Sequence, residues 1–311
     1  MSQSARKSVV GPWSGTFPAI TTSMHQDGSL DLEGTARHTE RLIASGVSGI
    51  IYLGSLGENQ MLSADEKRLV MREMVGVVGG RIPVLSGVAE TSTAEAIRYT
   101  QDCEAMGVDG IMLMPAMCYK TPDIEETKAH LVAVANKTGM PIMIYNNPIS
   151  YGNDITPENF LELSDVKNFV AIKESTGNTR RITDMHNTVG GRYAMFTGVD
   201  DLALESAILG LDGWVCGTGI AFPEENQYLW DLIVAGEWAK AVEIYRWFSP
   251  LLHLDVSVKL VQNIKLCLQE VGLGTEWVRA PRLQLVGAER EAILKVIRTG
   301  IENRPQLPAR A

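Results

Sequence analysis

Lys173 is the residue whose position in the sequence points most directly to chemistry. It follows the apolar run 169–172, which is typical of a buried strand, and it precedes Glu174 and Ser175. In a parallel α/β barrel, the carboxyl end of each strand lies at the mouth where such enzymes carry out catalysis. A lysine desolvated there has a lowered pKa, and its neutral amine can attack a carbonyl carbon to form an imine. A strand-end lysine paired with a carboxylate is the alternative interpretation of the same position.

Tyr145 ends the preceding apolar run, 141–145, directly before Asn146, Asn147 and Pro148. If the two runs are adjacent parallel strands, the phenol and the Lys173 amine lie together at one level. A phenol can donate and accept a proton when a neighbouring cation or hydroxyl lowers the cost of its ionisation. Taken alone, Tyr145 also fits a tyrosine packed inside the barrel and bonded to a backbone carbonyl.

Glycine-rich loops follow three of the apolar runs and could bind an anionic substrate. The first, 54–58, reads GSLGE, and its two glycines permit a tight turn whose N–H groups face a carboxylate beside the Ser55 hydroxyl. The other two contain Gly198 and Gly217 and fall where many barrels bind anions. Taken alone, a GxxGE string is most often only an ordinary connection between a strand and a helix.

The chain lacks the signatures of the common cofactors. Neither a P-loop nor a GxGxxG fingerprint occurs, so we expect no nicotinamide or flavin. The five histidines show no metal-ligand spacing, and we expect no metal; they are His25, His38, His130, His186 and His253.

Eight short apolar runs alternate with helix-like segments. The runs are 17–21, 49–53, 83–88, 110–114, 141–145, 169–173, 194–197 and 213–216. They are apolar almost throughout rather than alternating, as in parallel strands buried on both faces. Helix windows between them include 31–45, 63–78 and 91–106, and Ser63 with Glu66 forms a capping-box pattern. Eight such units in series favour a (β/α)₈ barrel over an open sheet.

After Pro223 the pattern changes to helices alone, at about 224–235, 237–252, 256–271 and 288–299. We predict a barrel over residues 12–235 and a C-terminal helical extension of the same domain over 236–302. Loosely ordered tails are expected at 1–11 and, because of Pro305 and Pro308, at 303–311.

The composition limits the classes of partner and the location. The 311 residues are 45% hydrophobic and 21% charged, which is ordinary for a soluble globular protein. A net charge of -9 gives no reason to expect a nucleic acid partner, although local N–H groups can still bind a small anion. The four cysteines form no CxxC pair, and neither a signal peptide nor a membrane span is evident, so we expect a cytoplasmic protein.

Taken together, the GSLGE loop, Tyr145 in YNNP and Lys173 in IKES resemble the dihydrodipicolinate synthase and N-acetylneuraminate lyase family, over about residues 13–298. The resemblance implies a homo-oligomeric Schiff-base lyase, either a dimer or a tetramer, that acts on a small 2-oxo-acid-like substrate. It places the imine-forming lysine at Lys173, the catalytic tyrosine at Tyr145 and a catalytic, substrate-binding hydroxyl at Ser55. Tyr119 matches a tyrosine that some members lend across a dimer interface.

Two positions depart from the family pattern. Leu56 stands where a threonine usually helps to bind the substrate carboxylate, and Ser150 stands where synthases have an arginine for the second substrate's carboxylate. A neutral serine cannot replace a bidentate guanidinium. The segments 145–152, 198–205 and 280–283 are most similar to Δ1-pyrroline-4-hydroxy-2-carboxylate deaminases of hydroxyproline degradation.

We therefore expect dehydration and deamination of that cyclic imine to 2-oxoglutarate semialdehyde. An imine on Lys173 would acidify the C3 proton, Tyr145 would move that proton, and the C4 hydroxyl would leave as water. The alternatives are 4-hydroxy-tetrahydrodipicolinate synthase, a 2-oxo-3-deoxy-sugar-acid aldolase or dehydratase, and a metabolite-binding barrel without catalysis.

Overall fold

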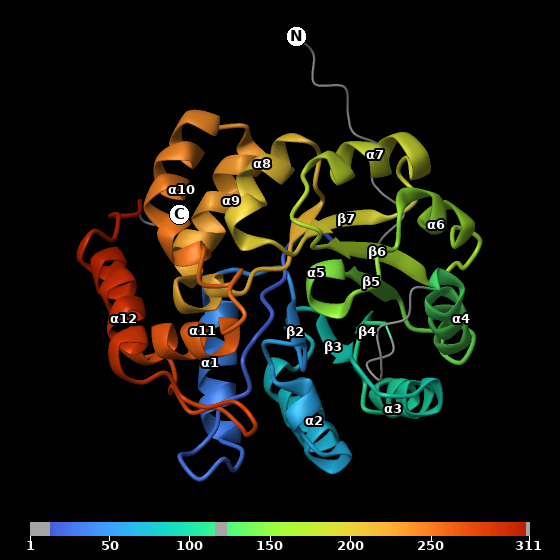
Figure 1. Cartoon of the computed structure of the whole chain (residues 1–311), viewed down its shortest axis with the longest axis horizontal. Helices are drawn as coiled ribbons and strands as arrows, with labels where there is room; N and C mark the ends of the chain where they lie inside the picture. Colours follow the sequence, from blue (N-terminus) through green and yellow to red (C-terminus); the bar gives the residue numbers. More distant parts are fainter. Residues whose placement is uncertain (1–12, 116–122, 309–311) are drawn as a thin grey trace.

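The computed structural model describes residues 13–115 and 123–308, and its centre is a sheet of eight parallel strands (Figure 1). The strands are β1 (Gly15–Thr16), β2 (Ile50–Tyr52), β3 (Val84–Val88), β4 (Gly110–Leu113), β5 (Ile142–Asn146), β6 (Phe169–Glu174), β7 (Ala194–Thr197) and β8 (Gly213–Trp214). Their order is β1-β8-β7-β6-β5-β4-β3-β2, so each strand lies beside its neighbours in sequence and β1 pairs with β8. The predicted (β/α)₈ barrel is confirmed.

The ring closes between β1 and β2 through a short, irregular connection. Gly15 pairs with Gly213 of β8, whereas Ala19 bridges Ile51 of β2. The Ile51 N–H donates to the carbonyl of Pro18 at 3.0 Å. The strand expected at 17–21 is therefore displaced and interrupted, because Pro18 has no N–H with which to continue a regular ladder.

Alternate residues along each strand face opposite sides of the barrel wall, and both sides are apolar. Side chains that point inward form one hydrophobic cluster, which includes Ile51, Leu85, Met112, Met143 and Phe196. Their neighbours in sequence belong to a larger cluster that also contains residues of the surrounding helices. This double burial is the reason why the strands are apolar almost throughout.

Helices follow the strands and cover the outside of the barrel. They are α1 (Leu32–Ala44), α2 (Ala64–Val78), α3 (Thr93–Ala105), α4 (Ile124–Ala135), α5 (Pro148–Tyr151), α6 (Pro157–Glu162), α7 (Arg180–Val189), α8 (Ala203–Ile208) and α9 (Pro223–Ala235). The predicted capping box before α2 is confirmed, since Ser63 accepts from the Glu66 N–H and the Glu66 side chain accepts from the Ser63 N–H. In the part of the chain that is described, no helix is long and apolar enough to cross a membrane.

Three further helices, α10 (Trp238–Leu252), α11 (Leu260–Glu270) and α12 (Gly287–Glu302), pack at one side of the barrel (Figure 1). A buried ion pair connects this extension to the loop after β2: Lys265 Nζ donates to Glu58 Oε1 at 2.5 Å. The Arg279 N–H donates to the other Glu58 oxygen at 3.0 Å. Within the C-terminal tail, Arg304 pairs with Glu225 at 2.5 Å.

Candidate active site

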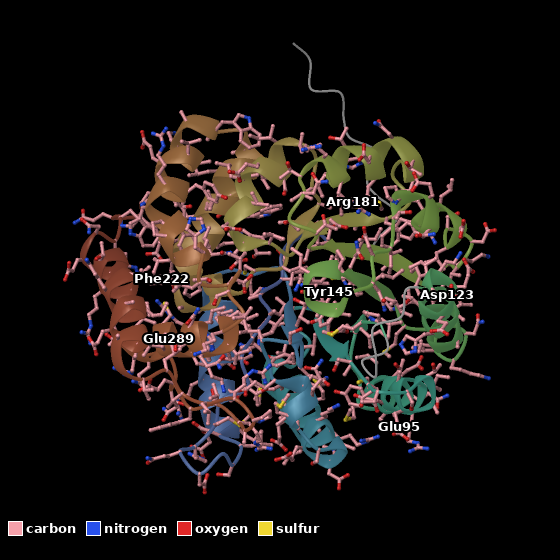
Figure 2. All side chains as sticks on the ribbon, viewed as in Figure 1. Glu95, Asp123, Tyr145, Arg181, Phe222 and Glu289 are labelled. Carbon is pink, nitrogen blue, oxygen red and sulfur yellow. The ribbon has the colours of Figure 1, made fainter. Side chains whose placement is uncertain are left out.

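Lys173 and Tyr145 are register partners on adjacent strands. β5 and β6 pair so that Tyr145 lies opposite Lys173, and Lys173 Nζ lies 4.1 Å from the centroid of the tyrosine ring. Both side chains are almost fully buried, with 6% of Tyr145 and 7% of Lys173 exposed. Tyr145 lies beside α5, close to the middle of the molecule (Figure 2). The phenol and the amine therefore lie close together, as the sequence predicts.

Burial changes the proton affinity of both groups. It lowers the pKa of Lys173, while the carboxylate of Asp255 opposes this effect more than any other charge does. It raises the pKa of Tyr145 to about 12, although a hydrogen bond from Asn147 Nδ2, at 2.9 Å, acts in the opposite direction. A lysine that gives up its proton more readily than usual can act as a nucleophile, and a neutral phenol can donate a proton.

The Ser55 hydroxyl is hydrogen-bonded to the hydroxyl of Tyr151. The Tyr151 ring packs edge-on against the Tyr145 ring, with centroids 5.6 Å apart. Tyr151 comes from α5, a short helix that starts at Pro148 and whose first turn is capped by Asn147. We did not single out Tyr151 from the sequence; the signal for it was the NNP capping pattern, which folds the chain back after β5.

The loop after β2 has two different faces. In the described part of the chain, no hydrogen bond uses the N–H groups of Ser55 and Leu56, so both can donate to an anion. The Leu56 side chain, in contrast, is buried in the cluster between strands and helices. Glu58 is the last residue of the GSLGE motif. It forms the buried ion pair with Lys265, which connects the loop to the C-terminal extension. Tyr119 lies outside the described residues.

The two other glycines of interest make close packing possible. A Cβ on Gly198 would come within 2.2 Å of Lys173 Cε, so only glycine leaves room for the lysine stem. A Cβ on Gly217 would come within 2.1 Å of Asp255 Oδ1. The Gly217 N–H donates a hydrogen bond to the Asp200 carboxyl group at 3.1 Å. The anion that this turn binds is therefore a side chain of the protein itself.

Two carboxyl groups, Asp255 and Asp200, act electrostatically on Lys173 and raise its pKa against the effect of burial. Asp200 follows β7 and is fully buried, and burial raises its pKa to about 6. Asp255 lies between α10 and α11. Sequence reasoning missed both residues, and only the GVDD segment after β7 hinted at the first. No group of three or more metal-ligating side chains occurs among residues 13–115 and 123–308.

A parallel (β/α)₈ barrel with a buried lysine and tyrosine at adjacent strand ends is the architecture of the class I Schiff-base lyases. The chain belongs to the dihydrodipicolinate synthetase family, whose model matches residues 12–299.

Individual relatives support the same assignment. The chain is 33% identical to a 4-hydroxy-tetrahydrodipicolinate synthase of Methylococcus capsulatus, over 91% of this chain and 97% of the relative. Among solved structures, the synthase of Methylacidiphilum fumariolicum SolV is 29% identical with a TM-score of 0.88, covering 93% of this chain and 96% of the other. A dihydrodipicolinate synthase of Acinetobacter baumannii complexed with pyruvate is 28% identical, also with a TM-score of 0.88, covering 92% and 98%.

Proposed function

We propose that Lys173 attacks the carbonyl of a small 2-oxo-acid-like substrate and holds it as an imine. The observation that carries this proposal is the buried Lys173 amine, paired in register with Tyr145 and 4.1 Å from its ring. A buried lysine with a lowered pKa supplies the neutral amine that imine formation needs. The free N–H groups of Ser55 and Leu56 are suited to the substrate carboxylate.

Tyr145, Tyr151 and Ser55 would move protons during imine formation and the later steps. The Ser55 hydroxyl is bonded to that of Tyr151, whose ring packs against the ring of Tyr145. A proton can pass along the hydrogen bond between the Ser55 and Tyr151 hydroxyls, and the Tyr145 phenol can donate or accept a proton beside Lys173. No cofactor is required, because the imine itself withdraws electrons from C3.

The names of the relatives favour condensation by a 4-hydroxy-tetrahydrodipicolinate synthase as the first candidate reaction. Every relative described above is a synthase by name, and the similarity covers nearly the whole of both chains. In this reaction the enamine formed on Lys173 would attack an aldehyde carbon of the second substrate.

The second candidate is deamination of Δ1-pyrroline-4-hydroxy-2-carboxylate, and Ser150 favours it. This residue lies on α5 with its side chain exposed and carries no charge with which to bind a second carboxylate. A five-membered cyclic imine has one carboxylate, on the carbon that bonds Lys173. The single anion site at Ser55 and Leu56 is then sufficient.

Borohydride trapping tests the imine. Reduction in the presence of pyruvate should attach the substrate to Lys173, and Lys173→Ala should abolish the labelling. Mass spectrometry that finds the adduct on Lys259 or Lys265 instead would contradict the proposal.

Steady-state assays decide between the two reactions. kcat/KM should be measured for pyruvate with aspartate semialdehyde and for Δ1-pyrroline-4-hydroxy-2-carboxylate, with wild type and Ser150→Arg. The synthase requires the first pair to be the better substrate, whereas the deaminase requires the cyclic imine to be the better one. If the chain is a deaminase, Ser150→Arg should not improve the condensation.

We also propose that the chain forms a homodimer or homotetramer and acts in the cytoplasm. A hollow of about 920 Å³ includes Ile208, Val234 and Trp238, which are 61%, 71% and 40% exposed. Large exposed apolar side chains gathered in this way are typical of surfaces that bind another protein. Light scattering of the purified chain gives the number of subunits.

A further inference from the structure

The loop after β2 has an unusual backbone at both of its ends. Among residues 13–115 and 123–308, Leu53 and Glu58 are the only residues other than glycine with left-handed backbone, at φ 53° and 59°. They stand directly before the GSLGE motif and at its last position. This conformation is unfavourable for a residue with a Cβ and persists where the surroundings impose it. Contacts with the rest of the molecule must therefore hold the loop in shape.

The barrel holds the first end and the middle of the loop. The buried Asn59 side chain donates through Nδ2 to the Leu53 carbonyl at 2.9 Å and to the Gly87 carbonyl of β3 at 3.2 Å. The Thr22 hydroxyl donates to the Gly57 carbonyl at 2.7 Å. None of these contacts involves the side chain of Glu58.

The C-terminal extension holds the other end. Glu58 is 0% exposed, and its Oε1 accepts from Lys265 Nζ of α11 at 2.5 Å. Its Oε2 accepts from the Arg279 N–H at 3.0 Å and lies 3.8 Å from Arg282 Nη1. Lys265, which is 1% exposed, also donates to the Trp277 carbonyl at 2.8 Å. Both carboxyl oxygens of Glu58 are thus bound by a segment that lies far along the chain.

The Glu58 backbone connects this ion pair to the groups that can bind an anion. Its N–H donates to the Ser55 carbonyl at 3.1 Å and closes a turn around Leu56 and Gly57. The N–H groups of Ser55 and Leu56, which no hydrogen bond uses within the described residues, belong to this turn. A rotation of Glu58 would change the directions in which both N–H groups point, and hydrogen bonds weaken steeply when they are misaligned.

We propose that the ion pair of Glu58 and Lys265 is a positioning element, which aims the Ser55 and Leu56 N–H groups at the carboxylate of the substrate on Lys173. This inference rests on the proposed imine chemistry and deepens it, because it gives the C-terminal extension a role in substrate selection without contact to the substrate. Donors that are already aimed bind an anion without first being ordered. Without the pair, the loop would bind the carboxylate less well, and Lys173 would discriminate less between a 2-oxo acid and a simple ketone.

The test compares pyruvate with acetone as partners of Lys173. Each can form an imine that cyanoborohydride reduces to a stable adduct, but only pyruvate has a carboxylate. The ratio of the two labelling rates therefore measures carboxylate binding, and it does not depend on how much of the protein is folded. In Lys265→Met this ratio should fall by about tenfold or more, because a single hydrogen bond to a charged group is worth roughly that much in affinity.

A double variant covers the case in which Lys265→Met does not fold. Glu58→Gln combined with Lys265→Met removes both charges of the pair, so neither is left buried without its partner. The glutamine keeps an oxygen that can accept from the Arg279 N–H. The labelling ratio should fall in the double variant as it does in the single one.

Arg304→Met is the matched control. It removes the cation of another ion pair between the C-terminal segment and the barrel, in which Arg304 Nε lies 2.5 Å from Oε1 of the buried Glu225 on α9. The labelling ratio should stay at the wild-type value. An unchanged ratio in the Lys265 variants, or the same fall in Arg304→Met, overturns the positioning role.

Wild type itself separates this inference from the proposed function. If pyruvate does not label wild type at all, the imine on Lys173 is wrong, and the positioning role is lost with it. If acetone labels wild type as fast as pyruvate does, the imine stands, but the loop after β2 binds no carboxylate and has nothing to aim.

Discussion

Lys173 Nζ lies 4.1 Å from the centroid of the Tyr145 ring, so the amine packs against the face of the tyrosine that is its register partner. An aromatic face attracts a cation, whereas burial favours the neutral amine. The pKa of Lys173 is lowered, and burial is the largest cause. The same ring face would stabilise the positive charge that returns when an imine forms, which suits a residue that must be neutral first and cationic later.

Replacing Tyr145 with phenylalanine separates the ring from the hydroxyl. Because the ring still packs against Lys173, Tyr145→Phe should fold and keep much of its borohydride labelling. Turnover should fall by roughly 10²–10⁴-fold, since the proton donor is lost. Near wild-type kcat would reduce Tyr145 to a packing residue of the barrel interior.

The hydrogen bond between Ser55 and Tyr151 should make their substitutions non-additive. Ser55→Ala and Tyr151→Phe each break the same bond, so the double variant should lose less activity than the two single losses predict. Contacting residues typically couple by about 0.5–3 kcal/mol. A double-mutant cycle on kcat/KM measures this coupling, and strictly additive effects would show that the two hydroxyls act separately.

Glu58→Gln should destabilise the fold strongly, because it leaves the buried ammonium of Lys265 without its counter-charge. Breaking a buried pair by removing one partner typically costs about 3–5 kcal/mol. Urea unfolding provides the measurement.

The exposed pair of Lys259 and Glu289, at 2.6 Å, offers the control for that substitution. Glu289→Gln should cost no more than about 1 kcal/mol, because water screens exposed pairs. Similar losses for the two variants would mean that Glu58 does not hold the extension to the barrel.

His38 should make the protein less stable in acid. Its buried Nε2–H donates to the Ile220 carbonyl at 2.8 Å, and burial lowers its pKa from 6.5 to about 4. The unfolded chain therefore binds a proton more readily than the folded one does. As the pH falls from above 6.5 to about 4, the free energy of unfolding should drop by about 3 kcal/mol through this group alone.

The comparison that isolates His38 is His38→Gln, which keeps a donor but cannot titrate. Asp200 and Asp255 have raised pKa values and act in the opposite direction, equally in both proteins. The difference in stability between wild type and variant should therefore change between pH 7 and pH 4. A constant difference across that range would show that His38 does not titrate as expected.

The sequence by itself determined the barrel and its central pair of residues. Strands buried on both faces must be apolar throughout, and this pattern is visible without a structure. Lys173 and Tyr145 end consecutive apolar runs, and consecutive strands in a barrel are neighbours. The order of the strands alone therefore predicts that the two side chains lie close together. Pro18 interrupts the first strand because it lacks an N–H. The apolar pattern did not predict this interruption.

Only the tertiary structure decided what surrounds that pair. Asp255 lies on the C-terminal extension, and Tyr151 reaches Ser55 because α5 folds back. Glu58, the last residue of GSLGE, is bound by Lys265 instead of by a substrate. The two hydrogen bonds join positions 96 and 207 residues apart, and they depend on the paths of loops and helices. Periodicity and strand order describe neighbours within the sheet, whereas side chains delivered from outside it are placed by packing alone.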